Sequence, residues 1–511
     1  MNLGAFGKFV VPALIVFVSR AGDSTEPSRE VDIAHAYCQA CHLFPEPSLL
    51  DKQTWINGAL RRMAPLLGAA RINLDNRPDA KILKEAGIFP TAPIISQKDW
   101  VAISQFYRDQ APALPFAQKA HAPIGNNLSG FEIHRLTYSG SKHLSCLVRI
   151  DPRANRFFIG NAAPPSLDIV SVTGDLISRI PLDSPPVDLT VRPEGFYLTL
   201  IGNLFPSDEK NGKLVIATPK DGRFEVRTLI DQLSRPTSAS FADLNNDGRE
   251  DLVLCCFGNY LGKVSWFEQK PTGDYLEHLL LEQSGAVNSV FSFTSKKTTP
   301  DIFVLTAQAR EGIHLFMKNS EIGFSHRILA EFHPAFGSSH LEVVDFNQDG
   351  FPDLLVTNGD NGDYPSQFKS YHGIRIYMND GKGNFYEKWF YPLNGAFKAV
   401  VADFDNDGDL DIAAISFFPD YSKSPSESFV YFENKGGLEF VPSSFPGNTA
   451  GRWLTMDAAD VDGDGDVDIV LGSFAEGPES IPIPAELHAQ WRTNDCAVLW
   501  LENKSSSRRR K

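Results

Sequence analysis

The feature that most constrains the fold of this 511-residue chain is an acidic nine-residue pattern, D-x-[DN]-x-D-G-x-x-D, which occurs four times. The copies begin at Asp243, Asp345, Asp403 and Asp460, and each runs directly into an apolar stretch such as residues 252–254. Oxygen-bearing side chains at alternate positions can converge on one hard cation, and the glycine permits the sharp turn that this convergence needs. Each copy therefore predicts a calcium-binding turn.

These turns differ from the calcium loops that lie between two helices. An EF-hand loop carries a bidentate Glu at its twelfth position, whereas that position is apolar here and the ninth position is always Asp. The flanking residues 399–402 and 412–415 have the composition of strands. We therefore expect calcium in turns between strands; a plain acidic turn without metal is the alternative, and the fourfold repetition of the ligand pattern argues against it. The predicted calcium ligands are Asp243, Asn245, Asp247, Asp251, Asp345, Asn347, Asp349, Asp353, Asp403, Asp405, Asp407, Asp411, Asp460, Asp462, Asp464 and Asp468.

The spacing of the copies predicts the architecture. The gaps are 102, 58 and 57 residues, so the first gap spans two periods and should contain a degenerate unit, which we place near residues 288–330. Repeats of this length are typical of propellers and solenoids. Six further strands mark six units, and the last unit lacks an outer strand that the isolated strand 131–136 would supply. The sequence thus predicts an all-β, seven-bladed propeller over residues 130–503, closed by that strand so that no sheet edge stays open.

The four turns resemble those of FG-GAP/VCBS repeats, the family of integrin alpha-like β-propellers, over roughly residues 130–503. This resemblance implies calcium in the four turns, mainly as a structural ion, with about four ions in total. It implies no metal in the first, second and fourth units, which lack the ligand set. Because this fold serves as a scaffold for many roles, the resemblance does not name a function.

Cationic side chains precede the acidic turns at fixed distances. Arg235 and Arg452 lie eight residues before the first Asp of their turns, and His340 and Lys398 lie five residues before it. The segment before each turn should be the innermost strand of its blade, so these four residues are expected near the central channel. They could bind an anionic ligand or a docked haem edge, or they could simply balance neighbouring acids, as structural ion pairs also do.

A second motif lies near the N-terminus. Residues 38–42 read C-x-x-C-H, the sequence to which haem c is attached. Cys38 and Cys41 would form the thioether bonds, and His42 would be an axial ligand of the iron. A zinc site is disfavoured because no second Cys/His pair follows at usable spacing. A thioredoxin-like site is disfavoured because no βαβ pattern surrounds the motif.

The second axial ligand follows by elimination. Within residues 31–115 the remaining candidates are Met63 and His35. His35 lies three residues before Cys38, on the attachment side, so Met63 is the predicted ligand, with ordinary core packing as its alternative role. The layout resembles small class I-like cytochrome c domains, which implies a small all-α domain carrying one covalent haem c and working in electron transfer.

The N-terminus predicts export. In residues 1–21 a basic Lys8 precedes a short apolar run that ends in small residues, as in a signal peptide. A membrane anchor is the alternative, but the run is too short to span a bilayer comfortably. We therefore expect an exported, periplasmic or cell-surface protein without a transmembrane segment after cleavage. Residues 116–129 should form a linker, and residues 504–511 a basic tail.

Charge and motifs leave two classes of function open. The formal net charge of −15 argues against nucleic acid as a partner. In the first class the haem exchanges electrons with a redox partner protein, and the propeller binds that partner or a ligand. In the second the chain is a periplasmic oxidoreductase whose propeller binds a small-molecule electron donor. No catalytic residue is assigned, because the propeller sequence shows no nucleophile–base pair or cofactor motif, which favours the first class. The remaining cysteines have no disulfide-framework spacing and are expected to be buried apolar residues.

Overall fold

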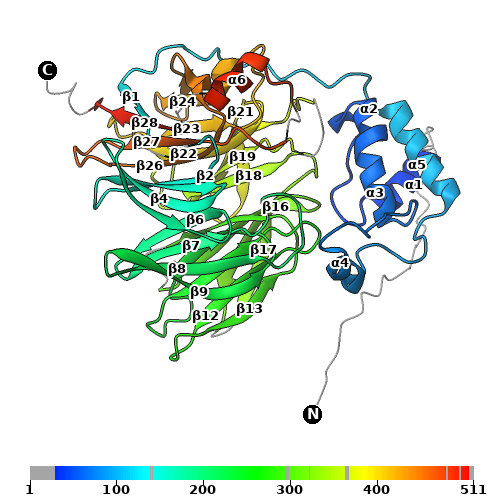
Figure 1. The fold of residues 1–511 in the computed structure, drawn as a ribbon. Coiled ribbons are helices and arrows are strands. Elements are labelled where there is room, and N and C mark those ends of the chain that lie inside the picture. The colour runs from blue at the N-terminus through cyan, green and yellow to red at the C-terminus, as the bar shows by residue number, and fades with distance from the viewer. Residues whose placement is uncertain are drawn as a thin grey trace.

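The computed structural model describes residues 29–138, 140, 142–293, 298–320, 323–362, 367–478, 481–493 and 497–505. Seven four-stranded antiparallel sheets form the blades of a propeller, and a small group of helices lies against one face of it (Figure 1). The predicted signal peptide, Cys496 and residues 506–511 of the tail lie outside the described residues. The seven-bladed propeller and the helical N-terminal region are thereby confirmed.

The helical region is built around the packing of its first helix against its last. Its elements are α1 (Arg29–Cys38), η1 (Pro47–Leu49), α2 (Lys52–Thr54), the π-turn η2 (Trp55–Ala59), α3 (Leu60–Leu66), α4 (Ala80–Ala86) and α5 (Gln97–Gln110). Ser96 caps α5 by accepting a hydrogen bond from the Asp99 N–H (3.1 Å). Ala34 of α1 packs with Ile103 and Tyr107 of α5, and all three are fully buried. These contacts close a small apolar core.

Each propeller blade runs outward from an innermost strand. In chain order the blades are β2 (Ser145–Asp151), β3 (Arg156–Ala162), β4 (Pro165–Ser171) and β5 (Leu176–Pro181); β6 (Pro186–Arg192), β7 (Gly195–Leu200), β8 (Gly212–Lys220) and β9 (Arg223–Leu233); β10 (Pro236–Ala242), β11 (Asp251–Cys256), β12 (Lys263–Gln269) and β13 (Tyr275–Leu281); β14 (Ala286–Ser292), β15 (Asp301–Thr306), β16 (Glu311–Lys318) and β17 (Phe324–Phe332); β18 (Ser338–Val344), β19 (Asp353–Asn358), β20 (Gly373–Asn379) and β21 (Phe385–Pro392); β22 (Ala396–Ala402), β23 (Asp411–Ser416), β24 (Phe429–Asn434) and β25 (Phe440–Ser443); and β26 (Trp453–Ala459), β27 (Asp468–Ser473), β28 (Val498–Asn503) and β1 (Phe131–Leu136). The short elements η3 (Pro425–Ser428), η4 (Asn448–Ala450) and α6 (Ala485–Thr493) lie in the loops of the last two blades.

The ring closes through a strand from the beginning of the propeller. β1 pairs antiparallel with β28, with Phe131 opposite Asn503 and Leu136 opposite Val498. The seventh blade therefore joins the first strand of the propeller to its last three, which covers the outer edge of β28. Leu136 is 3% exposed and packs in the core of this seam.

The apolar core lies between neighbouring blades. The second strand of most blades is buried along its whole length, as in β11, β19, β23 and β27, because both faces of each blade pack on a neighbour. Cys255 and Cys256 are buried there on β11. The fourth blade, β14–β17, corresponds to the degenerate unit expected near residues 288–330. No helix in the described ranges is long and apolar enough to cross a membrane.

Every innermost strand carries the same irregularity. Each has a register shift just after its first residue, between Ser338 and His340 in β18 and between Ala396 and Lys398 in β22, for example. A bulge of this kind increases local twist and re-aims the side chains that follow it. Residues after the bulge in six blades, His340 and Lys398 among them, line a cavity on the propeller axis.

The seam predicts a large difference between two neighbouring substitutions. Leu136→Ala removes a buried side chain and should lower the free energy of unfolding by about 2–4 kcal/mol. Arg135→Ala, on the exposed side of the same strand, should change it by no more than about 0.5 kcal/mol. Urea unfolding followed by circular dichroism measures both; equal effects would contradict a packed seam.

Candidate functional site

The acidic turns and the helices occupy opposite faces of the propeller. The turns join the innermost strand to the second strand in the blades that begin with β10, β18, β22 and β26. The helices instead contact loops between second and third strands, among them the loops holding Asp208, Arg310 and Tyr371. Because successive strands run in opposite directions, these two sets of loops lie at opposite ends of the strands.

The four acidic turns share one backbone conformation. In the first three turns the first Asp accepts hydrogen bonds from the N–H groups of the fifth and sixth residues, as Asp243 does from Asp247 (3.2 Å) and Gly248 (2.9 Å). In the fourth turn Asp460 accepts from the fourth and sixth residues, Gly463 and Gly465. The fourth residue has a left-handed φ, which is 60° at Asn246 and 58° at Asn406. Asn, Gln or Gly occupies this position in the four turns, and Asn and Gly adopt this conformation most readily. The sequence pattern thus folds each turn so that its carboxylates gather.

The ninth-position aspartates fasten the turns to the sheets. Asp251, Asp353, Asp411 and Asp468 are fully buried. Asp468 accepts hydrogen bonds from the N–H groups of Val461 (3.0 Å) and Asn503 (2.7 Å), which tie the turn to the end of β28. Burial raises the pKa values of Asp411 and Asp468 to about 7. A divalent cation would favour their ionised forms.

The third and fourth turns gather carboxylates most closely. Asp403, Asp405 and Asp411 form one group, and Asp460, Asp462 and Asp464 form another, with the oxygens of each group within 4.8 Å of one another. Such groups can hold a metal ion. Two of the four predicted turns therefore contain a carboxylate cluster suited to a metal.

The first and second turns are less charged. The third position of each carries an amide, and Asn245 and Asn347 donate to Asp247 (2.9 Å) and Asp349 (3.0 Å). In the first turn the Arg249 guanidinium also forms an ion pair with Asp247. The four turns are therefore unequal, because fewer ligand charges lower the affinity for calcium.

The C-x-x-C-H motif has two free thiols and an oriented histidine. Cys38 ends α1 and is half-buried, Cys41 is exposed, and both are free thiols. The His42 Nδ1 donates to the Leu43 carbonyl oxygen (2.8 Å), which orients the ring and leaves Nε2 for a metal. Burial lowers the pKa of His42, so the imidazole is held neutral, as ligation requires.

The two candidates for the second axial position have different surroundings. His35 stacks on Phe44 with ring centroids 3.7 Å apart. Met63 lies half-buried on α3, outside the apolar cluster that includes Leu60 and Leu67. The role of Met63 as an iron ligand stays a prediction.

The C-x-x-C-H motif faces the propeller. The Arg310 Nε donates to the Cys41 carbonyl oxygen (2.8 Å), and the Tyr371 hydroxyl donates to the Leu49 carbonyl oxygen (3.0 Å). Ala335, from the loop between β17 and β18, belongs to the apolar core of the helical region. Polar and apolar contacts together hold the helices on loops of the second, third, fourth and fifth blades.

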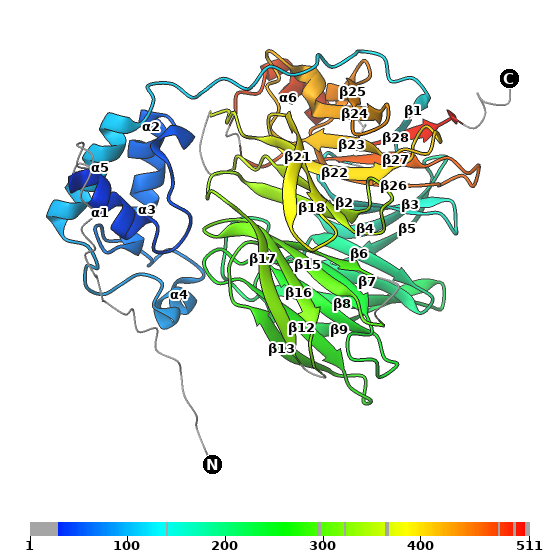
Figure 2. The same ribbon diagram turned by 180° about the vertical axis from the view of Figure 1, so that it is seen from behind.

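The segment between α5 and β1 follows the surface of the propeller. The Tyr391 hydroxyl donates to the Ala122 carbonyl oxygen (2.9 Å), Gly125 forms a bridge with Ser443, and Leu128 is buried. In both views this segment, which we call the strap (residues 111–130), crosses from the helices to β1 (Figure 2). It was expected as a linker, and its ordered contacts give it a second role in holding the helices in place.

The structure separates the four cationic residues expected near the channel. The Arg235 guanidinium donates to the carbonyl oxygens of Asn203, Leu204 and Gly258. Arg452 is fully buried and donates to three carbonyl oxygens in the neighbouring loops of residues 417 and 476–478. Both arginines therefore stabilise loops at the channel mouth, which favours a structural role. Arg235, His340 and Lys398 line the axial cavity, and Arg452 is not among its lining residues.

Charged residues missed in the sequence also reach the cavity region. Arg149 forms ion pairs with Asp188 (3.0 Å) and Asp457 (3.2 Å). The three residues come from three different blades. Asp457 also accepts a hydrogen bond from the Ile150 N–H (2.8 Å). Aligning the innermost strands by sequence could have found these residues. Arg149, Asp457 and Glu342 occupy the same place in their strands, two residues after the position that His340 holds in β18.

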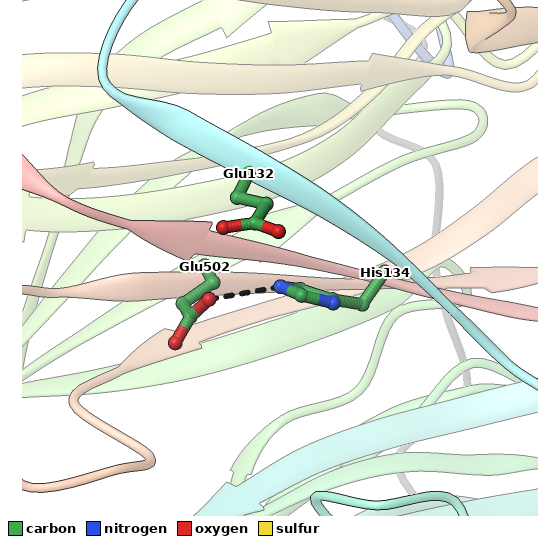
Figure 3. Close-up of side chains that lie close together, drawn as sticks. All are labelled: Glu132, His134 and Glu502. Atoms are coloured by element: carbon green, nitrogen blue, oxygen red, sulfur yellow. Dashed lines mark hydrogen bonds and ion pairs between the residues drawn. The ribbon is translucent and has the colours of Figure 1, made fainter.

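A polar cluster lies at the seam. The His134 Nε2 lies 2.8 Å from Glu502, and Glu132 is beside them on β1 (Figure 3). Glu502 also pairs with Lys504, which lies 4.0 Å from Asp462 in the fourth acidic turn. The cluster therefore links ring closure to that turn through charge pairs.

Comparison with known proteins identifies the repeat. Residues 361–414 match the profile of the FG-GAP-like repeat. This segment contains the third acidic turn and parts of the fifth and sixth blades, so an FG-GAP-like repeat within a seven-bladed propeller is confirmed. No curated protein matches the sequence.

Several solved structures resemble the fold. The N-terminal domain of Nup159 is 13% identical, with 75% of this chain and 98% of that chain covered and a TM-score of 0.41. Sqt1 of Saccharomyces cerevisiae is 9% identical, with 74% and 99% covered and a TM-score of 0.42. A putative 6-phosphogluconolactonase from Bacteroides uniformis is 12% identical, with 58% and 83% covered and a TM-score of 0.36. None of these likenesses assigns a function.

The carbonyl contacts of Arg452 predict a loss of stability. Arg452→Met keeps the apolar stem but removes the donors of three carbonyl groups, so it should lower the free energy of unfolding by about 2–4 kcal/mol. Arg227→Met, at an exposed position on β9, is the control and should have little effect. Chemical unfolding measures both, and an unchanged stability of Arg452→Met would contradict the structural role.

Proposed function

We propose that this chain is an exported electron-transfer protein in which the helical region carries one covalent haem c. The observation that carries the proposal is the C-x-x-C-H motif, whose His42 ring is oriented by Leu43 so that Nε2 is left for iron. The bound haem would supply a one-electron redox centre. Cys38 and Cys41 would hold it covalently, and Met63 is the proposed second ligand.

The propeller would serve as the mount and the partner-binding scaffold. Arg310 and Tyr371 donate hydrogen bonds to backbone carbonyl groups of the helical region. These bonds would orient the region independently of the side chains at the accepting residues. A fixed mount presents the same edge of the haem site to a redox partner at each encounter. Export to the periplasm or cell surface would agree with haem attachment outside the cytoplasm, and with the signal peptide predicted at residues 1–21.

Calcium would stabilise the propeller through its acidic turns. The carboxylate groups of the third and fourth turns are the proposed primary sites. Burial of Asp411 and Asp468 in the absence of a cation costs free energy, which the ion would offset. The turns around Asn245 and Asn347 would bind calcium more weakly.

One observation favours a second candidate, a periplasmic oxidoreductase. The axial cavity has a volume of about 600 Å³ and shares Phe257 and Asp360 with a smaller hollow. That hollow is also lined by Ala335, which packs in the core of the helical region. A small electron donor in the cavity would thus lie on the side of the propeller that faces the proposed haem.

A visible spectrum tests the haem proposal. Protein produced in a host that matures c-type cytochromes should show a haem c spectrum, with haem that resists acid–acetone extraction. Met63→Ala should abolish the methionine-to-iron charge-transfer band, while the control His35→Ala should retain it. A colourless protein would refute the haem, and loss of the band only in His35→Ala would refute Met63.

Calcium should stabilise the protein more strongly as the pH rises. In the calcium-free fold Asp411 and Asp468 have pKa values of about 7, against about 4 in the unfolded chain. The fold therefore binds more protons than the unfolded chain between these values, so its stability falls as the pH rises through about 7. Calcium needs the ionised carboxylates, and the calcium-induced rise in Tm should be larger at pH 8 than at pH 5.

Scanning calorimetry of calcium-depleted and calcium-loaded protein measures this difference. Asp405→Asn should reduce the calcium-induced rise in Tm, whereas Asp409→Asn, in the same turn but outside the ligand pattern, should preserve it. A Tm that ignores calcium at every pH would refute the proposed sites.

A further inference from the structure

The axial cavity is lined by polar groups that already have partners. The Asn288 side chain bonds twice to the backbone of Leu341 (2.9 and 3.2 Å). The Thr237 hydroxyl donates to the Ala286 carbonyl oxygen (2.9 Å), and Asp188 accepts from the Ala239 N–H (2.9 Å). Each contact joins the innermost strands of two neighbouring blades. These groups hold the ring together and have little capacity left for a ligand.

Two neighbouring side chains of the same wall differ. His340 and Lys398 follow the bulges of β18 and β22, in adjacent blades. The Lys398 ammonium makes no hydrogen bond and no ion pair within 4.0 Å anywhere in the residues that the structure describes. The His340 Nδ1 is buried without a partner. Lys398 is half-buried in the cavity wall, and its three donors are directed to water or to an acceptor inside the cavity.

The surrounding charges limit what that acceptor can be. Asp188 and Asp457 pair with Arg149, and Glu342 accepts a hydrogen bond from the Val401 N–H (3.1 Å). None of these acids forms an ion pair with Lys398 within 4.0 Å, although all three attract its charge from a greater distance. Their negative charge nevertheless disfavours a multiply charged anion such as phosphate. A single carboxylate matches the ammonium without adding a second negative charge.

The cavity is large enough for such a ligand. Its volume of about 600 Å³ falls in the range of small-molecule sites, about 300–1,000 Å³. It extends to Arg235, Phe257 and Asp360 at the face that carries the helices. We propose that Lys398 and His340 bind the carboxylate group of a small organic acid inside the central channel. This site goes beyond the electron-transfer function and does not require the haem.

Isothermal titration calorimetry of the full chain tests the site, with lactate and gluconate as probes and glycerol and inorganic phosphate as comparisons. At least one of the two acids should bind, and glycerol and phosphate should bind at least about tenfold more weakly. Lys398→Met should weaken the acid by at least about tenfold. Lys220→Met, at an exposed position on β8, should leave binding unchanged.

A second pair of variants covers the case in which Lys398→Met does not fold, as judged by circular dichroism and Tm. His340→Asn keeps a donor near the position of Nδ1 and should retain binding, whereas His340→Leu removes it and should weaken binding. The proposal is overturned if neither acid binds, if phosphate binds more tightly than both acids, or if the folded Lys398 and His340 variants bind like the wild type. The haem spectrum is recorded separately, so a failure here leaves the electron-transfer proposal to its own test.

Discussion

The pairing of β1 with β28 is the contact on which the rest of the molecule depends. It converts a row of seven sheets into a ring, and only a ring encloses an axial cavity and places innermost strands face to face. The same strand follows the strap from the helical region, so the closing strand is also the point at which the helices are joined to the propeller. The side-chain contacts around the seam, from Leu136 to Lys504, connect it to the last acidic turn.

The blade count could be predicted because its signals are local. A nine-residue pattern and a period near 57 residues survive in the sequence even where one unit has lost most of its ligands. The isolated strand at residues 131–136 gave the seventh blade, because a sheet edge left open is unfavourable. The gathering of Asp403, Asp405 and Asp411 could be anticipated for the same reason, since the ligands lie within one turn.

The channel was less predictable because its contacts join distant parts of the chain. Arg235 and Arg452 stood at the expected mouth, but sequence spacing cannot tell which carbonyl oxygens surround a guanidinium. The pairing of Arg149 with Asp188 and Asp457 depends on blades 1, 2 and 7 meeting at the axis. The hydrogen bond from Arg310 to the Cys41 carbonyl oxygen could not be predicted either, since 269 residues separate the partners. Only the folded structure shows that Lys398 has no hydrogen-bond or ion-pair partner among the residues it describes.

The guanidinium of Arg249 gives the first acidic turn a cation of its own. On the proposed calcium chemistry, that turn has an internal substitute for the ion, whereas the third and fourth turns gather three carboxylates each and would depend more on calcium. The third blade, which bears that turn, also contacts the helices through Tyr260, while the last two blades meet near the seam. At low calcium concentration the sixth and seventh blades, next to the seam, would then be destabilised first. The third blade, which contacts the helices, would be destabilised last.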